Sequence, residues 1–128
     1  MTIAEVSKQY HLSADTLRYY ERIGLIPPVG RTSGGIRDYT EEDCRWIEFA
    51  KCMRSAGLAI ESLVEYVALF QQGDETIPAR KQILMEQRED LIQRIQEMQN
   101  TLQRLNYKIE RYEQTVLPAE KKLKKRTS

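Results

Sequence analysis

The sequence predicts a mainly α-helical chain, with several short helices in its first 72 residues followed by one long helix. Ser and Thr residues suited to helix N-caps precede short apolar repeats. Pro27-Pro28 and Gly34-Gly35 interrupt the helical pattern with turn signals. Apolar residues then recur at alternating spacings of four and three from Leu91 onward. Together these features predict a helical head, a small β insertion and a long terminal helix.

Composition restricts the class of protein before any motif is considered. The 128 residues hold 20 Lys and Arg against 19 Asp and Glu, for a net charge of +1. No apolar run approaches the roughly 18 residues of a membrane span, and no signal-peptide pattern opens the chain. Cys44 and Cys52 are too few for a disulfide framework. We therefore expect a soluble, cytoplasmic chain with no membrane partner.

The head begins with two helix starts in close succession. Thr2 and Glu5 form a capping-box pattern for a helix that ends near Tyr10. Ser13 is a suitable N-cap for a second helix, which Gly24 stops. Two short helices joined by a tight turn predict a helix-turn-helix.

A hairpin is predicted directly after this helix pair. Gly34-Gly35 lies between two short segments, as in a β-hairpin turn. In the second strand, Arg37 and Tyr39 share one face and Ile36 takes the other. A hairpin in this place is a wing, so the fold predicted for residues 1–72, with two further helices, is a winged helix-turn-helix.

The long helix, over residues 73–118, carries a coiled-coil pattern. Its length is on the order of 57 Å, more than the small head can cover, so its apolar stripe predicts a homodimer. The e and g positions leave parallel and antiparallel pairing open. Residues 119–128 form a basic tail, which we expect to be disordered. The predicted dimer interface consists of Leu91, Ile95, Met98, Leu102, Leu105, Ile109 and Tyr112.

A local basic zone suggests a nucleic-acid surface in the head. Residues 8–37 hold five basic side chains against two acidic ones, although the charge pattern alone favours an ordinary solvated helix face. If the zone binds DNA, the second helix faces the major groove, and residues of the hairpin and third helix reach phosphate. The predicted DNA-binding residues are Thr16, Arg18, Tyr19, Arg22, Arg37, Tyr39, Lys51 and Arg54.

Enzymatic and metal-binding functions find no support. The chain has one His, no Gly-rich phosphate loop and no metal motif, so we expect no cofactor and no metal. Cys44 and Cys52 lie eight residues apart on one predicted helix, or about 12 Å along its axis, too far to share a metal ion. The alternative to a DNA-binding protein is a coiled-coil interaction module.

Three motifs, in order, resemble the MerR family of bacterial transcription regulators. They are LRYYERIGLI at residues 17–26, GGIRDY at 34–39 and RSAGL at 54–58. The resemblance implies a dimer that joins through an antiparallel coiled coil and binds a palindromic operator in double-stranded promoter DNA on the bacterial nucleoid. It also implies activation, in which the regulator distorts an over-long promoter spacer so that RNA polymerase can use both promoter elements.

Cys52, within FAKCMR at residues 49–54, resembles the thiol of the small AdhR- and NmlR-type branch of that family. This resemblance implies a response to aldehyde, nitrosative or oxidative stress. Lys51 and Arg54 favour a thiolate, and an adduct at Cys52 is expected to force repacking where the DNA-binding half meets the helix that leads into the dimer seam. A packed structural Cys, in a regulator without thiol sensing, remains the alternative, and Cys44 is a second candidate thiol. Ala59 departs from the family, whose members often have a Ser N-cap there.

Overall fold

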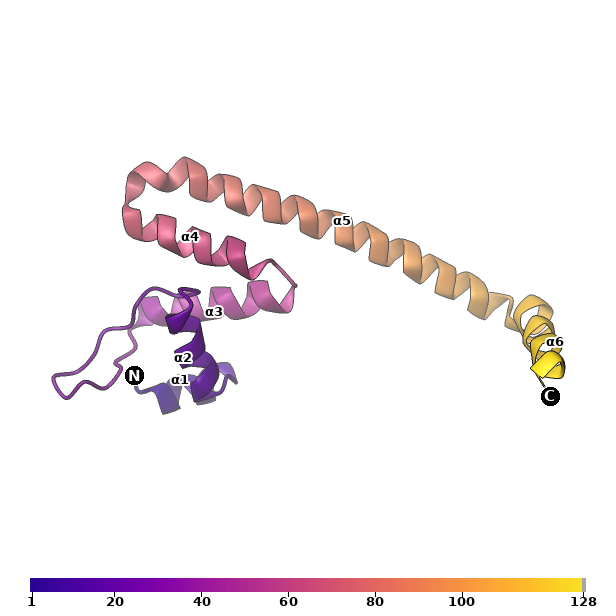
Figure 1. The fold of residues 1–128 in the computed structure, drawn as a ribbon, viewed down its shortest axis with the longest axis horizontal. Helices are drawn as coiled ribbons and strands as arrows, with labels where there is room; N and C mark the ends of the chain where they lie inside the picture. The colour runs from indigo at the N-terminus through magenta and orange to yellow at the C-terminus, as the bar shows by residue number, and fades with distance from the viewer. Residues whose placement is uncertain (128) are drawn as a thin grey trace. The chain divides into compact units, whose positions relative to one another are not determined.

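The structure is a computed structural model that describes residues 1–127, and it is mainly helical (Figure 1). It forms two compact units, residues 1–89 and the chain from Asp90 onward. The first unit, called the head below, extends past residue 72, where the sequence pattern placed the domain boundary. It does so because the first turns of the long helix pack back on the preceding one. The helices of the head before that long helix are α1 (Ile3–Tyr10), α2 (Ala14–Arg22), α3 (Glu41–Ser55) and α4 (Ile60–Gln72).

Local capping starts three of these helices, as predicted. The Thr2 hydroxyl accepts a hydrogen bond from the Glu5 N–H, and the Glu5 carboxylate accepts one from the Thr2 N–H. The Ser13 side chain accepts a hydrogen bond from the Thr16 N–H in the first turn of α2, and Thr40 forms a second capping box at α3. Each cap satisfies N–H groups that have no partner within the helix.

One apolar core joins the four helices. Val6 of α1, Leu17 of α2 and Ile47 of α3 are fully buried. Leu25 and Ile26, from the loop after α2, join the same cluster with Leu63 of α4. Because α2 gives its apolar side to this core, its polar side faces outward.

The wing is a hairpin-shaped loop rather than a pair of strands. In residues 1–127 the structure has no β-strand, and one isolated antiparallel bridge joins Arg31 and Arg37. The Thr32 N–H donates to the Ile36 carbonyl, and Gly35, with φ +81°, takes the left-handed position of the turn. The predicted turn is therefore confirmed and the predicted strands are wrong. Two short strands without a third are marginal in water.

The link from α4 to the long helix reverses the chain. After Gly73, a short 3-10 turn, η1 (Asp74–Thr76), leads into α5 (Ile77–Glu110). In the head, α5 runs back along α4 (Figure 1), where Ile83 is buried. The Gln87 side chain accepts a hydrogen bond of 3.2 Å from the Ala59 N–H. Gln87 thereby satisfies one N–H at the start of α4, which lacks a side-chain N-cap.

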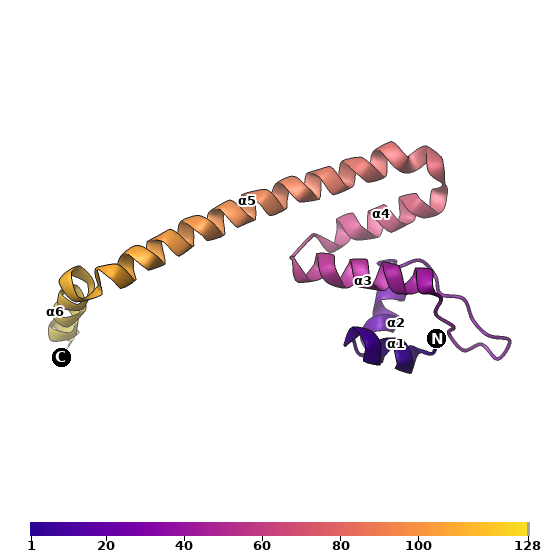
Figure 2. The same ribbon diagram turned by 180° about the vertical axis from the view of Figure 1, so that it is seen from behind.

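The second unit corrects the predicted end of the chain. Helix α5 ends at Glu110, a π-helical turn, η2 (Tyr112–Val116), follows, and α6 (Leu117–Thr127) then takes a new direction (Figure 2). The tail is thus helical over its described part, residues 119–127, and the expectation of disorder is wrong there; Ser128 lies outside the described residues. Pro118 lies in the first turn of α6 instead of ending a helix, because the first turn needs no N–H from it.

Candidate nucleic-acid interface

Helix α2 presents one polar stripe to solvent. Leu17 and Tyr20 point into the core, which turns the opposite side of the helix outward. That side carries Asp15, Arg18 and Tyr19, all of them exposed. Arg22 continues the same line one turn later, as helical periodicity requires. We call these four residues the α2 stripe.

Contacts within the α2 stripe hold its cations in place. Arg18 Nη1 lies 3.0 Å from Asp15 Oδ1, and the Arg22 guanidinium lies 5.3 Å from the centroid of the Tyr19 ring. Thr16 is half-buried beside the stripe, with its hydroxyl 2.8 Å from that of Ser13. The structure therefore brings together the four residues predicted on this helix. The sequence analysis missed Asp15, although the spacing of an acid three residues before Arg18 indicates such a pair.

A carboxylate of α2 ties the wing to this helix. Glu21 Oε1 accepts a hydrogen bond of 2.7 Å from Arg37 Nε, and Glu21 Oε2 accepts one of 3.0 Å from the Val29 N–H. The Glu21 and Arg37 side chains are only 15% and 22% exposed. Burial opposes the charge on Glu21, but the bonds from Arg37 and Val29 outweigh it and hold the pKa of Glu21 below its ordinary value.

The hydrogen bond to Glu21 limits how Arg37 can contact DNA. Its Nε is bonded to Glu21, so any DNA contact must use its Nη atoms. The sequence analysis missed Glu21 because its partners lie 8 and 16 residues away in the chain. No local pattern indicates such a distant pair.

Tyr39 does not lie on the surface, and its predicted contact with phosphate is wrong. The side chain is 2% exposed, and its hydroxyl is buried without a hydrogen-bond partner in the described structure. Burial raises the pKa of this phenol. Strand alternation placed Tyr39 beside Arg37, but no strand forms here. The backbone at Tyr39 instead bonds to Met1, whose carbonyl accepts from the Tyr39 N–H at 2.8 Å.

Lys51 and Arg54 have structural contacts on α3. The Lys51 ammonium donates to the Tyr10 carbonyl at the end of α1, and Arg54 Nη1 donates to the Leu58 carbonyl at 2.7 Å. Both cations thus satisfy carbonyls at chain turns. Their contact with the DNA backbone stays a prediction.

The two thiols differ in access. Cys52 is exposed on α3, whereas Cys44 is buried with its Sγ 4.0 Å from Met1 Sδ. In the single chain Cys52 lies outside the core of the head, so repacking by an adduct where the DNA-binding half meets the dimer helix stays a prediction. Within the described residues, no three His, Cys, Asp or Glu side chains are grouped as a metal site would require. No helix there is long and apolar enough to cross a membrane.

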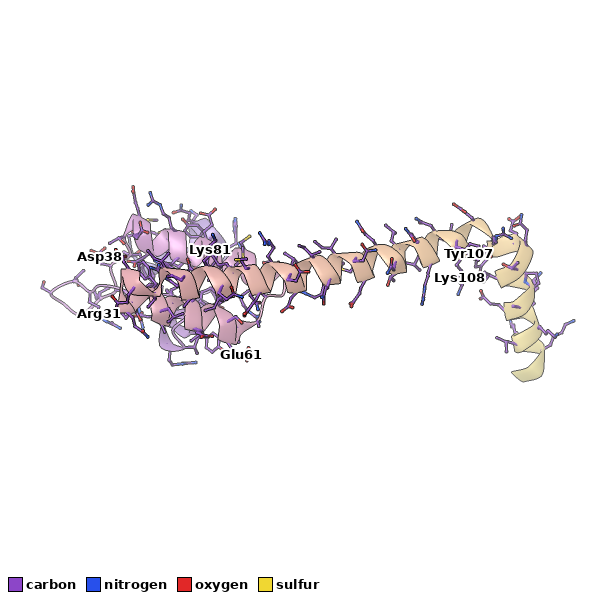
Figure 3. All side chains as sticks on the ribbon, turned by 90° about the horizontal axis from the view of Figure 1, so that it is seen from above. Arg31, Asp38, Glu61, Lys81, Tyr107 and Lys108 are labelled. Atoms are coloured by element: carbon purple, nitrogen blue, oxygen red, sulfur yellow. The ribbon has the colours of Figure 1, made fainter. Side chains whose placement is uncertain are left out.

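The part of α5 in the second unit carries an uncovered apolar stripe. Met98 is 71% exposed and Ile109 is 69% exposed, so the rest of the described chain leaves most of these two side chains open to solvent. Figure 3 shows side chains such as Tyr107 and Lys108 projecting from the end of this helix. Tyr112, predicted in the same interface, lies beyond the end of α5 in η2. The other predicted interface residues, all on α5, are Leu91, Ile95, Leu102 and Leu105.

Comparisons with known proteins agree with this architecture. The model of the MerR HTH family regulatory protein matches residues 1–69, and that of the MerR DNA-binding region matches residues 44–107. The regulator AdhR of Bacillus subtilis is 63% identical over 93 residues, which are 73% of this chain and 66% of AdhR. That match therefore spans slightly less than two thirds of AdhR.

Solved structures show the same fold. A MerR family regulator from Listeria monocytogenes superposes with a TM-score of 0.86 at 48% identity, over 99% of this chain and 96% of its own. HiNmlR, a MerR family regulator lacking the sensor domain and bound to promoter DNA, superposes with a TM-score of 0.79 at 29% identity, over 91% and 92%. MerR regulators bind promoter DNA as dimers and are not enzymes. The chain belongs to the MerR family of DNA-binding helix-turn-helix transcription regulators.

Proposed function

We propose that this chain is a dimeric transcription activator that binds a palindromic promoter operator and distorts an over-long spacer for RNA polymerase. The observation that carries the proposal is the α2 stripe, with Arg18, Tyr19 and Arg22 together on one exposed side. Helix-turn-helix proteins place such a helix in the major groove. The place of action is then promoter DNA on the bacterial nucleoid.

Dimerisation through α5 supplies the two-fold symmetry that a palindrome needs. The apolar stripe from Leu91 to Ile109 has the spacing of a coiled-coil seam, and from Ile95 onward it is exposed in the single chain. Two heads joined in this way contact two half-sites. Distortion follows if the separation of the heads differs from that of the half-sites on straight DNA.

Footprinting and transcription test this proposal together. The full chain is incubated with promoter fragments from its own genome, and the protected region is mapped. We expect a palindrome within an over-long spacer, affinity that falls steeply with salt, and transcription by RNA polymerase only with the protein present. A protected site outside any spacer, or repression alone, would contradict spacer distortion.

We also propose that Cys52 is a sensor thiol for aldehydes, nitrosating agents or oxidants. Its exposure supports this, because a reagent in solution can reach the thiol directly. The similarity to AdhR also supports this proposal. The contacts of Lys51 and Arg54 with backbone carbonyls weaken the argument that these cations favour a thiolate.

Paired Ser variants test the thiol. Transcription from the mapped promoter is measured for wild type, Cys52→Ser and Cys44→Ser, with and without each class of reagent. We expect Cys52→Ser to lose the induced response and keep basal DNA binding, and Cys44→Ser to keep both. A full response in Cys52→Ser would remove this residue as the sensor.

A further inference from the structure

The α2 stripe contains a carboxylate among its cations. The Asp15 side chain is 95% exposed, one residue after the first residue of α2. If the stripe faces DNA, this negative charge lies close to phosphates that repel it. A surface that bound the DNA backbone alone would gain nothing from it.

Base edges in the major groove offer a favourable partner for Asp15. The cytosine N4 amino group is a donor there, and a carboxylate is a pure acceptor. The first residues of a recognition helix are those that reach base edges. The position of Asp15 in the first turn of α2 therefore suits base contact better than phosphate contact.

Asp15 also directs the neighbouring arginine. Its bond to Arg18 Nη1, at 3.0 Å, uses one of the five N–H groups of that guanidinium and restrains its direction. The remaining N–H groups match the two acceptors of guanine. A carboxylate and an arginine held side by side present an acceptor and donors to neighbouring bases.

We propose that Asp15 is a specificity-determining residue, which accepts a hydrogen bond from the amino group of one cytosine in each half of the operator. This inference rests on the proposed function, in which α2 lies in the major groove. It assigns to Asp15 the choice of base at one position of each half-site, beside the guanine contact for which Arg18 is suited.

A purely structural role for Asp15 predicts different behaviour. An acid in the first turn stabilises a helix, and so does an exposed ion pair three residues apart. Helix α3 contains the same arrangement, since Glu42 Oε2 lies 2.9 Å from Arg45 Nη1 and both side chains are mostly exposed. Glu42→Gln therefore removes a matched charge and ion pair outside the α2 stripe.

The experiment selects binding sites from duplex DNA of randomised sequence. Wild type, Asp15→Asn, Asp15→Ala, Glu42→Gln and Arg18→Ala are used as full chains, and circular dichroism first checks that each is folded. The bound fractions are sequenced. The affinity of each variant is then measured for the wild-type consensus and for duplexes that carry each single base change.

We expect wild type and Glu42→Gln to require a C·G pair at one position in each half-site. For Asp15→Ala, the affinity advantage of the C·G pair at that position falls by about tenfold, which is the typical effect of one mismatched pair. The base preferences at the other positions stay unchanged. Asp15→Asn shifts the same position toward A·T, because an amide can pair with adenine in the major groove. Both Asp15 variants bind unrelated DNA more tightly than wild type, since a repulsive charge is gone.

An unchanged consensus and unchanged base preferences in both Asp15 variants would overturn the inference while leaving the proposed function intact. The inference is also overturned if Glu42→Gln alters the same position, because the effect would then come from charge or helix stability. If wild type selects no consensus, or if Arg18→Ala binds as tightly as wild type, the assignment of α2 to DNA itself fails.

Discussion

The link between α2 and the wing gives a prediction about Glu21. Its carboxylate accepts from Arg37 Nε at 2.7 Å and from the Val29 N–H at 3.0 Å. Glu21→Gln keeps the shape of the side chain, but it removes the charge and replaces one acceptor oxygen with a donor. One of the two bonds is then lost, and the Arg37 guanidinium stays half-buried without its counter-charge.

The expected loss is about 2 kcal/mol in the free energy of unfolding. Exposed ion pairs contribute roughly 0–1 kcal/mol, and breaking a fully buried pair costs roughly 3–5 kcal/mol. The Glu21 and Arg37 side chains, at 15% and 22% exposed, lie between these limits. A hydrogen bond to a charged group, at about 1.5–3 kcal/mol, gives a similar value.

The loss depends on pH in a defined direction. The pKa of Glu21 is lowered from its usual 4.5 in the folded chain, so its contribution is complete above that ordinary value. It disappears as the pH falls through the lowered pKa. Wild type and Glu21→Gln should therefore differ most at neutral pH and converge in strong acid.

Urea unfolding of the full chain, followed by circular dichroism, measures both effects. Protein concentration is held constant, because stability and dimerisation are linked. The matched control is Glu42→Gln, which removes an exposed pair on α3 and should change stability by no more than about 1 kcal/mol. Equal losses for the two variants, or a Glu21→Gln effect that persists unchanged in acid, would refute the reasoning.

Other positions give further expectations. Leu102→Lys places a charge in the α5 seam and should give monomers in sedimentation velocity; an unchanged dimer would exclude this stripe as the interface. Tyr39→Phe removes a buried hydroxyl that has no partner, so thermal melting should show equal or higher stability, and filter binding should show unchanged DNA affinity; weaker binding would restore a DNA role for this ring. Gln87→Ala should lower stability by about 0.5–1.5 kcal/mol, and Ala59→Ser should recover about 1 kcal/mol of it by supplying the missing cap; no change in either urea midpoint would contradict this account of α4.

The elements that were predicted correctly have causes within a few residues. Thr2 with Glu5, Ser13 and Thr40 start helices by contacts that span three residues, so the sequence displays them directly. The outward side of α2 follows from its helical period and from burial of Leu17. The heptad stripe of α5 is likewise a periodic signal.

The errors arise where distant residues decide the outcome. Tyr39 would alternate with its neighbours in a strand, but pairing with Met1, 38 residues earlier, takes the place of a strand. A proline fits both just after the end of one helix and in the first turn of the next. The sequence around Pro118 therefore does not decide between the two places. The structure resolves that choice by ending α5 at Glu110 and starting α6 at Leu117.

The arginines of the head show why charge alone is a poor guide to a DNA surface. The surplus of positive charge in residues 8–37 is small, which limits attraction to arbitrary DNA. Each arginine in this segment already contacts a protein group: a carboxylate, an aromatic ring or a backbone carbonyl. An arginine held in this way loses less freedom on binding than a mobile one, so fewer charges can give a specific contact. The four arginines held by such contacts are Arg18, Arg22, Arg31 and Arg37. The α2 stripe and the wing therefore favour selection of a DNA sequence over general affinity for DNA. The protein groups that hold these arginines matter for this selection as much as the arginines themselves.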